Sequence, residues 1–212
     1  MGLETLFVFL VLTGLVLLGS SLLRSSIRMV AMQGAALSFL PLLVMESSWA
    51  GRAVFLAALT MGLKGIVFPV LLNRSMREAN VRREMEPLVG YSLSLALGIA
   101  LLILAFWLAD RLHEIGVGIS TLSLAAAFFM MFTGLFLIIA RRKALTQVLG
   151  FLALENGIYS FGLTVVGHIH WLVELGVLLD VFVAVFIMGI AIDHISREFD
   201  HINVDQLDQL KG

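Results

Sequence analysis

Seven long apolar stretches constrain this chain more than any other feature of its sequence. Crossing the roughly 30 Å apolar layer of a bilayer takes about 20 helical residues. The qualifying stretches are Leu3–Leu23, Met29–Met45, Ala53–Leu72, Leu88–Ala109, Gly118–Ala140, Ala144–Val166 and Trp171–Ile192. Only 14% of the 212 residues are charged, against about 25% in soluble domains. We therefore predict an all-α integral membrane protein with about seven transmembrane helices.

The positive charges between these stretches predict the orientation of the chain. Alternating the connections of seven helices places most of the 14 Lys and Arg residues on one side. These residues are Arg24, Arg28, Arg74, Arg77, Arg82, Arg83, Arg141, Arg142, Lys143, Arg197 and Lys211. The other side receives only Arg52 and Arg111, while Lys64 falls inside a helix. Because Lys and Arg accumulate in cytoplasmic loops, we expect the N-terminus outside and the C-terminus in the cytoplasm.

The same pattern divides the chain into four parts. Residues 1–72 form an N-terminal three-helix unit, and residues 73–87 form a cytoplasmic loop that mixes arginine with glutamate. Residues 88–192 form a four-helix unit, and residues 193–212 form a polar cytoplasmic tail. We interpret the loop as a solvated connector, with docking of a cytoplasmic partner as the alternative.

Three ionisable residues lie deep inside predicted spans: Lys64, Glu155 and Asp180. They are eight, eleven and twelve residues from the cytoplasmic ends of their helices, which corresponds to roughly 12, 16 and 18 Å at 1.5 Å per residue. A charge at this depth costs about 2.5–3.5 kcal/mol on insertion scales, so it normally faces a partner or a water path. The similar depth of the three residues predicts that they can interact with one another.

Two interpretations of these buried charges remain open. In the first, burial and neighbouring charges change their proton affinities, so that protons are taken up and released in turn. In the second, Lys64 forms a fixed ion pair with Glu155 or Asp180 that only holds helices together. Asn156, beside Glu155, is expected to orient the carboxyl group or a water molecule. Gly150, Gly157 and Gly162 in the same helix allow either close packing or room for water.

Other polar residues lie nearer the membrane surfaces. Glu174 is about one turn from the outer end of the last span, close to His168 and His170, so a hydrated interfacial role competes with a role in a proton relay. The two histidines have no dedicated third ligand, so we do not predict a metal site. We interpret the basic clusters at Arg24, Arg28 and residues 141–143 as topology anchors, with attraction of partner carboxylates as the alternative.

The chain contains no cysteine. Disulfides, Cys-ligated zinc and thiolate-bound iron–sulfur clusters are therefore excluded. No phosphate-binding loop, dinucleotide fingerprint or hydrolase motif is present either, and nothing indicates binding of nucleic acid. We expect a protein without a cofactor of its own.

Three segments form a recognisable set: GFLALENG (150–157), VELGVLLDVFVAVFIM (173–188) and INVDQLDQLKG (202–212). They resemble component E of hydrogenase-4, a membrane subunit of formate-hydrogenlyase-type nickel–iron hydrogenases. The similarity extends upstream to LKGIVFPVLL around Lys64 and to residues 28–40. The resemblance implies a non-catalytic subunit of an energy-converting oxidoreductase in the inner membrane of a prokaryote. It also implies antiporter-like and membrane-anchor subunits as partners.

The last three predicted helices resemble the K subunit of respiratory complex I and the C subunit of multisubunit cation/proton antiporters. By that resemblance Glu155 matches the membrane glutamate of the K subunit's middle helix. Asp180 falls near the acid of its last helix after a shift of about one residue, which leaves the choice between Asp180 and Glu174 open. The resemblance implies that Lys64, Glu155, Asp180 and Glu174 contribute to proton or sodium translocation. A structural scaffold and a free-standing transporter are the alternatives.

Overall fold

The computed structural model describes residues 2–44, 50–78, 89–114 and 120–165, and the single positions Leu179, Val183, Ile187 and Gly189. Every element of regular structure in these ranges is helical. The elements are α1 (Leu3–Gly19), α2 (Leu23–Leu37), α3 (Leu40–Val44), α4 (Ala50–Thr60), the π-helical segment η2 (Met61–Val67), α5 (Phe68–Glu78), α6 (Tyr91–Glu114), α7 (Thr121–Ala140) and α8 (Ala144–Val165). The prediction of an all-α fold is confirmed for this part of the chain.

Five helical stretches are long and apolar enough to cross a membrane: Leu23–Val44, Ala53–Arg77, Tyr91–Glu114, Thr121–Ala140 and Ala144–Val165. The shorter helix α1 is apolar along its 17 residues. The predicted seventh span, Trp171–Ile192, and the tail from residue 193 lie outside the described residues, apart from the single positions given above. The coarse prediction of a multi-pass membrane protein therefore agrees with the described helices.

The first two spans differ from their predicted bounds. Helix α1 ends at Gly19 instead of Leu23, and the second span begins at Leu23 instead of Met29. The predicted loop residues Arg24 and Arg28 are therefore part of α2. Their long side chains can extend from a helix end into the polar layer, which hydropathy alone treats as a break. The α2–α3 stretch is interrupted just before Pro41, in agreement with the tolerance of proline in the first turn of a helix.

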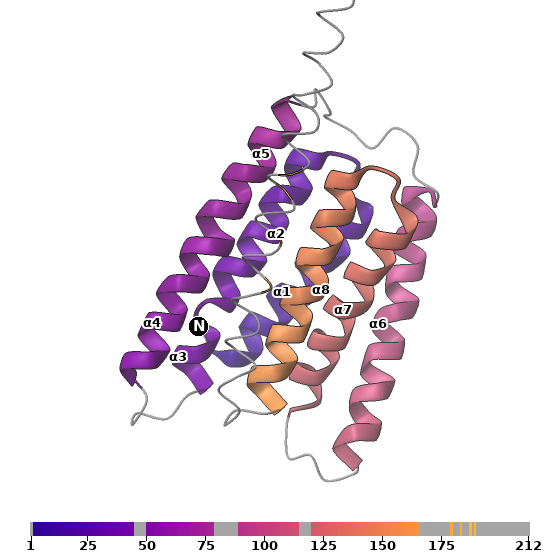
Figure 1. The fold of residues 1–212 in the computed structure, drawn as a ribbon. Coiled ribbons are helices and arrows are strands. Elements are labelled where there is room, and N and C mark those ends of the chain that lie inside the picture. The colour runs from indigo at the N-terminus through magenta and orange to yellow at the C-terminus, as the bar shows by residue number, and fades with distance from the viewer. Residues whose placement is uncertain are drawn as a thin grey trace, which may run out of the picture.

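The third span is one continuous helix built from α4, η2 and α5. Thr60 and Phe68, which flank η2, both have helical backbone angles. The helix continues to Glu78, so the predicted loop of residues 73–87 is helical in its first six residues. This end of α5 carries exposed arginines and lies at the same end of the bundle as the α7–α8 turn (Figure 1).

The helices run side by side, with the α4–α5 helix at one edge of the bundle and α6 at the other (Figure 1). Helices α1, α2, α7 and α8 lie between them. Large apolar side chains remain exposed on the two edge helices, including Phe55 at 64%, Ile66 at 62% and Ile103 at 66%. Because water would not tolerate so much exposed apolar surface, these faces are suited to lipid.

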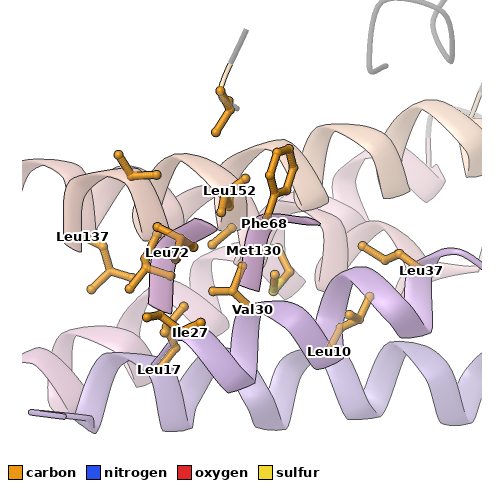
Figure 2. Packing of buried hydrophobic residues seen from close by; sticks show 14 of the residues in the cluster. Leu10, Leu17, Ile27, Val30, Leu37, Phe68, Leu72, Met130, Leu137 and Leu152 are labelled. Atoms are coloured by element: carbon orange, nitrogen blue, oxygen red, sulfur yellow. The ribbon is translucent and has the colours of Figure 1, made fainter. Parts of the chain in front are cut away.

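One buried cluster joins residues from the beginning and the end of the chain (Figure 2). Leu10 and Leu17 of α1 and Ile27 of α2 belong to it, as do Met130 of α7 and Leu152 of α8. Val183 and Ile187, from the predicted seventh span, are also buried in this cluster. Residues of the predicted units 1–72 and 88–192 therefore pack together in this cluster.

Candidate functional site

The structure brings Lys64 and Glu155 into direct contact inside the bundle. The Lys64 Nζ atom donates a hydrogen bond to Glu155 Oε1 at 2.9 Å, and the two side chains are only 4% and 2% exposed. Lys64 comes from η2 and Glu155 from α8, which are 91 residues apart in the sequence. A charge pair this deeply buried is costly to desolvate unless further hydrogen bonds support it.

Two more groups of α8 support the Lys64 ammonium. Asn156 Oδ1 accepts a second hydrogen bond from Lys64 Nζ at 3.2 Å. The centroid of the Tyr159 ring lies 5.3 Å from the same nitrogen, within the range of a cation–π interaction. Glu155, Asn156 and Tyr159 occupy adjacent turns of one helix, so α8 supplies a preformed receptor for a single ammonium group.

The backbone around Lys64 is a π-helical segment, a form that occurs frequently at functional sites. The Phe68 N–H donates to Leu63 O, five residues back instead of four. Two local features favour this wider turn. Gly62 and Gly65 have low α-helix propensity, and Pro69 lacks an N–H and would press its ring against the carbonyl four residues earlier in a regular α-helix. Lys64 therefore lies where the regular backbone hydrogen bonds between residues four apart are interrupted.

Gly34 of α2 allows the Lys64 side chain to enter the core. A Cβ atom at Gly34 would lie 2.5 Å from the Cβ atom of Lys64, closer than real Cβ contacts allow. Helix α2 therefore packs its backbone directly against the base of the lysine. Gly34 was not among the predicted site residues, although a small residue inside an apolar helix is a recognised signal of close helix packing.

The glycines of α8 pack against α7. Added Cβ atoms at Gly150 and Gly157 would lie 2.8 Å from Gly134 O and 2.7 Å from Met131 N, respectively. At Gly150 and Gly157 the structure shows close packing, one of the two predicted possibilities. Glu155 follows Gly150 by five residues, a rotation of about 140° at 3.6 residues per turn. The packed face of α8 thus turns Glu155 away from α7, toward η2 and α2.

Several buried polar atoms near the centre of the bundle have no hydrogen-bond partner within the described residues. They are Glu155 Oε2, Gln33 Oε1, Thr133 Oγ1 and Ser160 Oγ. Gln33 is fully buried, and its Nε2 atom donates to Thr13 Oγ1 at 3.0 Å. Buried polar atoms are normally satisfied by protein or by ordered water, so these atoms are natural positions for internal water.

A small cavity of about 10 Å³ adjoins the Lys64 end of the pair. Lys64 and Asn156 contribute its polar lining, and apolar side chains of α2, α5 and α8 complete it. About this volume is needed for the centre of one water molecule. A larger cavity, of about 630 Å³, lies between α2 and α5, and Pro69 lines both cavities. Pro69 therefore lies next to both the small cavity beside Lys64 and the larger cavity between α2 and α5.

The chain is 34% identical over 205 residues to a Mycobacterium tuberculosis protein named "Uncharacterized protein Rv0085". The match covers 95% of this chain and 92% of the relative. The chain belongs to the Rv0085 family. No family model matches the chain, and no solved structure matches it significantly.

The other predicted relay residues, Glu174 and Asp180, lie outside the described part of the chain. His168 and His170 lie outside it as well. Within the described residues, no group of three His, Asp or Glu side chains could hold a metal ion. The described site is thus Lys64 and Glu155 with their support from Asn156 and Tyr159.

Arg141 is buried and joins helices, a structural role that the sequence did not predict. It was interpreted as part of a basic topology anchor, yet its side chain is only 2% exposed. Its guanidinium donates to Leu18 O at 3.2 Å, near the end of α1, and lies 4.7 Å from the ring centroid of Tyr91. A cation at a helix C-terminus satisfies carbonyls that have no helical partner. Arg141 therefore ties α1 and α6 to the α7–α8 turn.

Proposed function

We propose that the chain is a membrane subunit of an energy-converting nickel–iron hydrogenase of the hydrogenase-4 type. In this role it moves protons, or sodium ions, across the prokaryotic inner membrane while other subunits carry out electron transfer. Its partners are antiporter-like subunits and the membrane anchor of the hydrogenase, and it holds no cofactor itself. The N-terminus lies outside and the C-terminus in the cytoplasm. The proposal rests on the sequence resemblance together with the chemistry of the buried pair.

The observation that carries the proton-relay role is the Lys64–Glu155 pair beside unpartnered polar atoms. One carboxylate oxygen of Glu155 binds Lys64, while Oε2 has no partner within the described residues. Both ends of the pair therefore have a place for water: one at Oε2 and one in the cavity next to Lys64. Buried polar atoms are normally satisfied, so the unpartnered Oε2 atom supports a role for Glu155 in exchanging protons with water.

A proton can cross this pair in three balanced steps. A proton from water binds Glu155 Oε2, which neutralises the carboxylate and weakens its hold on the ammonium. Lys64 then releases a proton to water in the adjoining cavity and becomes a neutral amine. Finally the protonated carboxyl group, after reorienting, gives its proton to the Lys64 nitrogen across the 2.9 Å contact and restores the ion pair. The net result is one proton moved from one side of the pair to the other.

Asn156 and Tyr159 stabilise the Lys64 ammonium in the state in which Glu155 is neutral. When the carboxylate is neutral, Asn156 Oδ1 and the Tyr159 ring still contact the Lys64 ammonium. An ammonium left alone in a low-dielectric interior would be far less stable. The wider backbone turn of η2 keeps the lysine at a point where peptide groups can also bind water.

The test is proton translocation by the assembled complex that carries Glu155→Gln. Glutamine still offers an oxygen to Lys64 but cannot carry a proton, so we expect normal assembly and a loss of at least about 100-fold in proton movement, the lower end of what general acid–base groups contribute. Glu114→Gln is the matched control, because this glutamate is 59% exposed and pairs with Arg111. Unchanged proton movement in Glu155→Gln, at unchanged assembly, would contradict the relay role.

The alternative is a scaffold in which the pair is permanent. The two hydrogen bonds and the ring contact of Lys64 are the observation that favours it. A scaffold predicts that Glu155→Gln alters assembly and proton movement to the same degree. A relay predicts that proton movement falls while assembly is kept, so the ratio of the two quantities separates the alternatives.

A further inference from the structure

Four arginines line the 630 Å³ cavity between α2 and α5. Arg24 and Arg28 come from the first turns of α2, and Arg74 and Arg77 from the last turns of α5. Spacings of four and three residues place each pair on one face of its helix. All four side chains are exposed. The cavity is therefore a basic pocket at one end of the bundle, where α5 ends beside the start of α2.

The positions of Arg24 and Arg28 are unfavourable for two cations without an anion. Like charges one turn apart on a helix repel each other. Arg24 and Arg28 also lie at the N-terminal end of α2, where the helix dipole disfavours cations, and no side chain caps this end. The same dipole, the uncapped N–H groups and the guanidinium groups all favour an anion in this pocket. Arginine in particular forms paired hydrogen bonds with phosphate.

The pocket also has an apolar side. Ile66 and Val70 line it one to two turns from the arginines, and their side chains are 62% and 60% exposed. They belong to the outward face of the third span, which is suited to lipid. A ligand that fills the whole pocket must therefore carry a negative group at one end and hydrocarbon at the other. A free phosphate would leave the apolar part of the cavity unoccupied.

We propose that this pocket binds an anionic phospholipid, with its phosphate held by Arg24, Arg28 and Arg77 and its acyl chains along Ile66 and Val70. Basic pockets between transmembrane helices are typical sites for such head groups. The volume of the cavity suits a head group and the first part of the chains. This binding site is independent of the proposed proton relay, because none of the three arginines contacts Lys64 or Glu155 in the described structure.

Native mass spectrometry of the full-length protein in detergent tests the proposal. Phosphatidylglycerol and phosphatidylcholine with the same acyl chains are added in turn, and the bound fraction is measured. We expect phosphatidylglycerol to bind more tightly. Arg24→Gln/Arg28→Gln should weaken that binding about 25-fold, at about fivefold per arginine near a membrane surface. Arg111→Gln, at the opposite end of the bundle and 61% exposed, should leave it unchanged.

Three results would overturn the proposal. Equal binding of the two lipids would show that charge is not recognised. Displacement of phosphatidylglycerol by an equal concentration of glycerol 3-phosphate would identify a site for soluble phosphate, because the acyl chains would then contribute nothing. Unchanged lipid binding in Arg24→Gln/Arg28→Gln, with loss of the variant from the assembled complex, would show that the arginines hold an acidic segment of a partner protein.

Discussion

Among the residues that the structure describes, two cations are buried, and their surroundings differ in kind. Lys64 binds the carboxylate of Glu155 and the amide oxygen of Asn156, in the middle of its helix. Arg141 donates to the backbone oxygen of Leu18, at the end of α1, and to that of Val89, just before the start of α6. Both side chains are almost completely removed from solvent, at 4% and 2% exposure. Depth of burial alone therefore does not distinguish their roles.

The partners of the two cations show which of them can take part in proton transfer. Arginine stays protonated in proteins, and backbone carbonyls cannot accept a proton in return. These contacts of Arg141 with backbone carbonyls therefore hold helices together. The side chains of lysine and glutamate are both able to exchange a proton with a neighbouring group. The Lys64–Glu155 contact thus joins two groups that meet the minimum chemical requirement for a relay.

The largest effect on stability is expected from Lys64→Met. It leaves the Glu155 carboxylate buried without its cation, and breaking a buried pair in this way costs about 3–5 kcal/mol. Unfolding in detergent, monitored by loss of helical circular dichroism, measures the change. A cost below about 1 kcal/mol would show that water already solvates Glu155 and that the contact contributes little.

Arg141→Gln is expected to cost about 2–3 kcal/mol, because hydrogen bonds from a charged group to buried carbonyls are lost. The neighbouring exposed residue offers a control, since Arg142→Gln should stay within about 0.5 kcal/mol of the wild type. The comparison of the two cations also predicts that Arg141→Gln reduces proton movement only in proportion to the loss of assembled complex. If proton movement fell more than the amount of assembled complex in this variant, Arg141 would also take part in proton transfer, in contradiction to the prediction.

Alanine substitutions at two glycines test how rigidly the surroundings of Lys64 are packed. Gly34→Ala would bring a methyl group against the rigid Cβ of Lys64, whereas Gly98→Ala would meet the end of the flexible Leu18 side chain. We expect a cost of about 1–3 kcal/mol for Gly34→Ala. Gly98→Ala should be close to neutral, because alanine gains about 1 kcal/mol of helix propensity. Equal costs in thermal unfolding would show that η2 adjusts as easily as a leucine side chain.

The exposed Arg111–Glu114 pair is the reference for a charge pair without burial. Its side chains are 61% and 59% exposed, although its N–O distance of 3.1 Å is close to that of the buried pair. Pairs of this kind contribute about 0.2–1 kcal/mol. Arg111→Gln should therefore change stability by less than about 1 kcal/mol, and high salt should reduce even this difference. A larger cost would mean that the end of α6 is itself buried in an assembly.

The sequence predicted the helical spans well where apolar residues decide their ends. Helices α7 and α8 begin and end within a few residues of the predicted stretches. The prediction was less accurate where charged residues belong to a helix, as at Arg24 and Arg28 of α2 or at the end of α5. Hydropathy measures the preference for lipid, while helix formation depends on backbone hydrogen bonds that continue into the polar layer.

The site was predictable in part. The similar depths of Lys64 and Glu155 follow from counting residues, and the structure places the two groups in contact. Counting could not show which way each side chain turns, because rotation about a helix depends on neighbours such as Gly34 and Gly150. The π-helical segment was also missed, since it results from a shift in hydrogen bonding that glycine and Pro69 permit without requiring. The buried position of Arg141 depends on partners that are distant in sequence.

Removing both charges of the buried pair is the strongest test of whether protons pass through Lys64 and Glu155. In Lys64→Met/Glu155→Leu, no charge is left unpaired, and apolar replacement of a buried pair is often neutral or stabilising. We predict that this double variant recovers the stability and assembly that Lys64→Met loses, while proton movement by the complex stays abolished. Wild-type proton movement in a fully assembled double variant would contradict the claim that protons pass through Lys64 and Glu155.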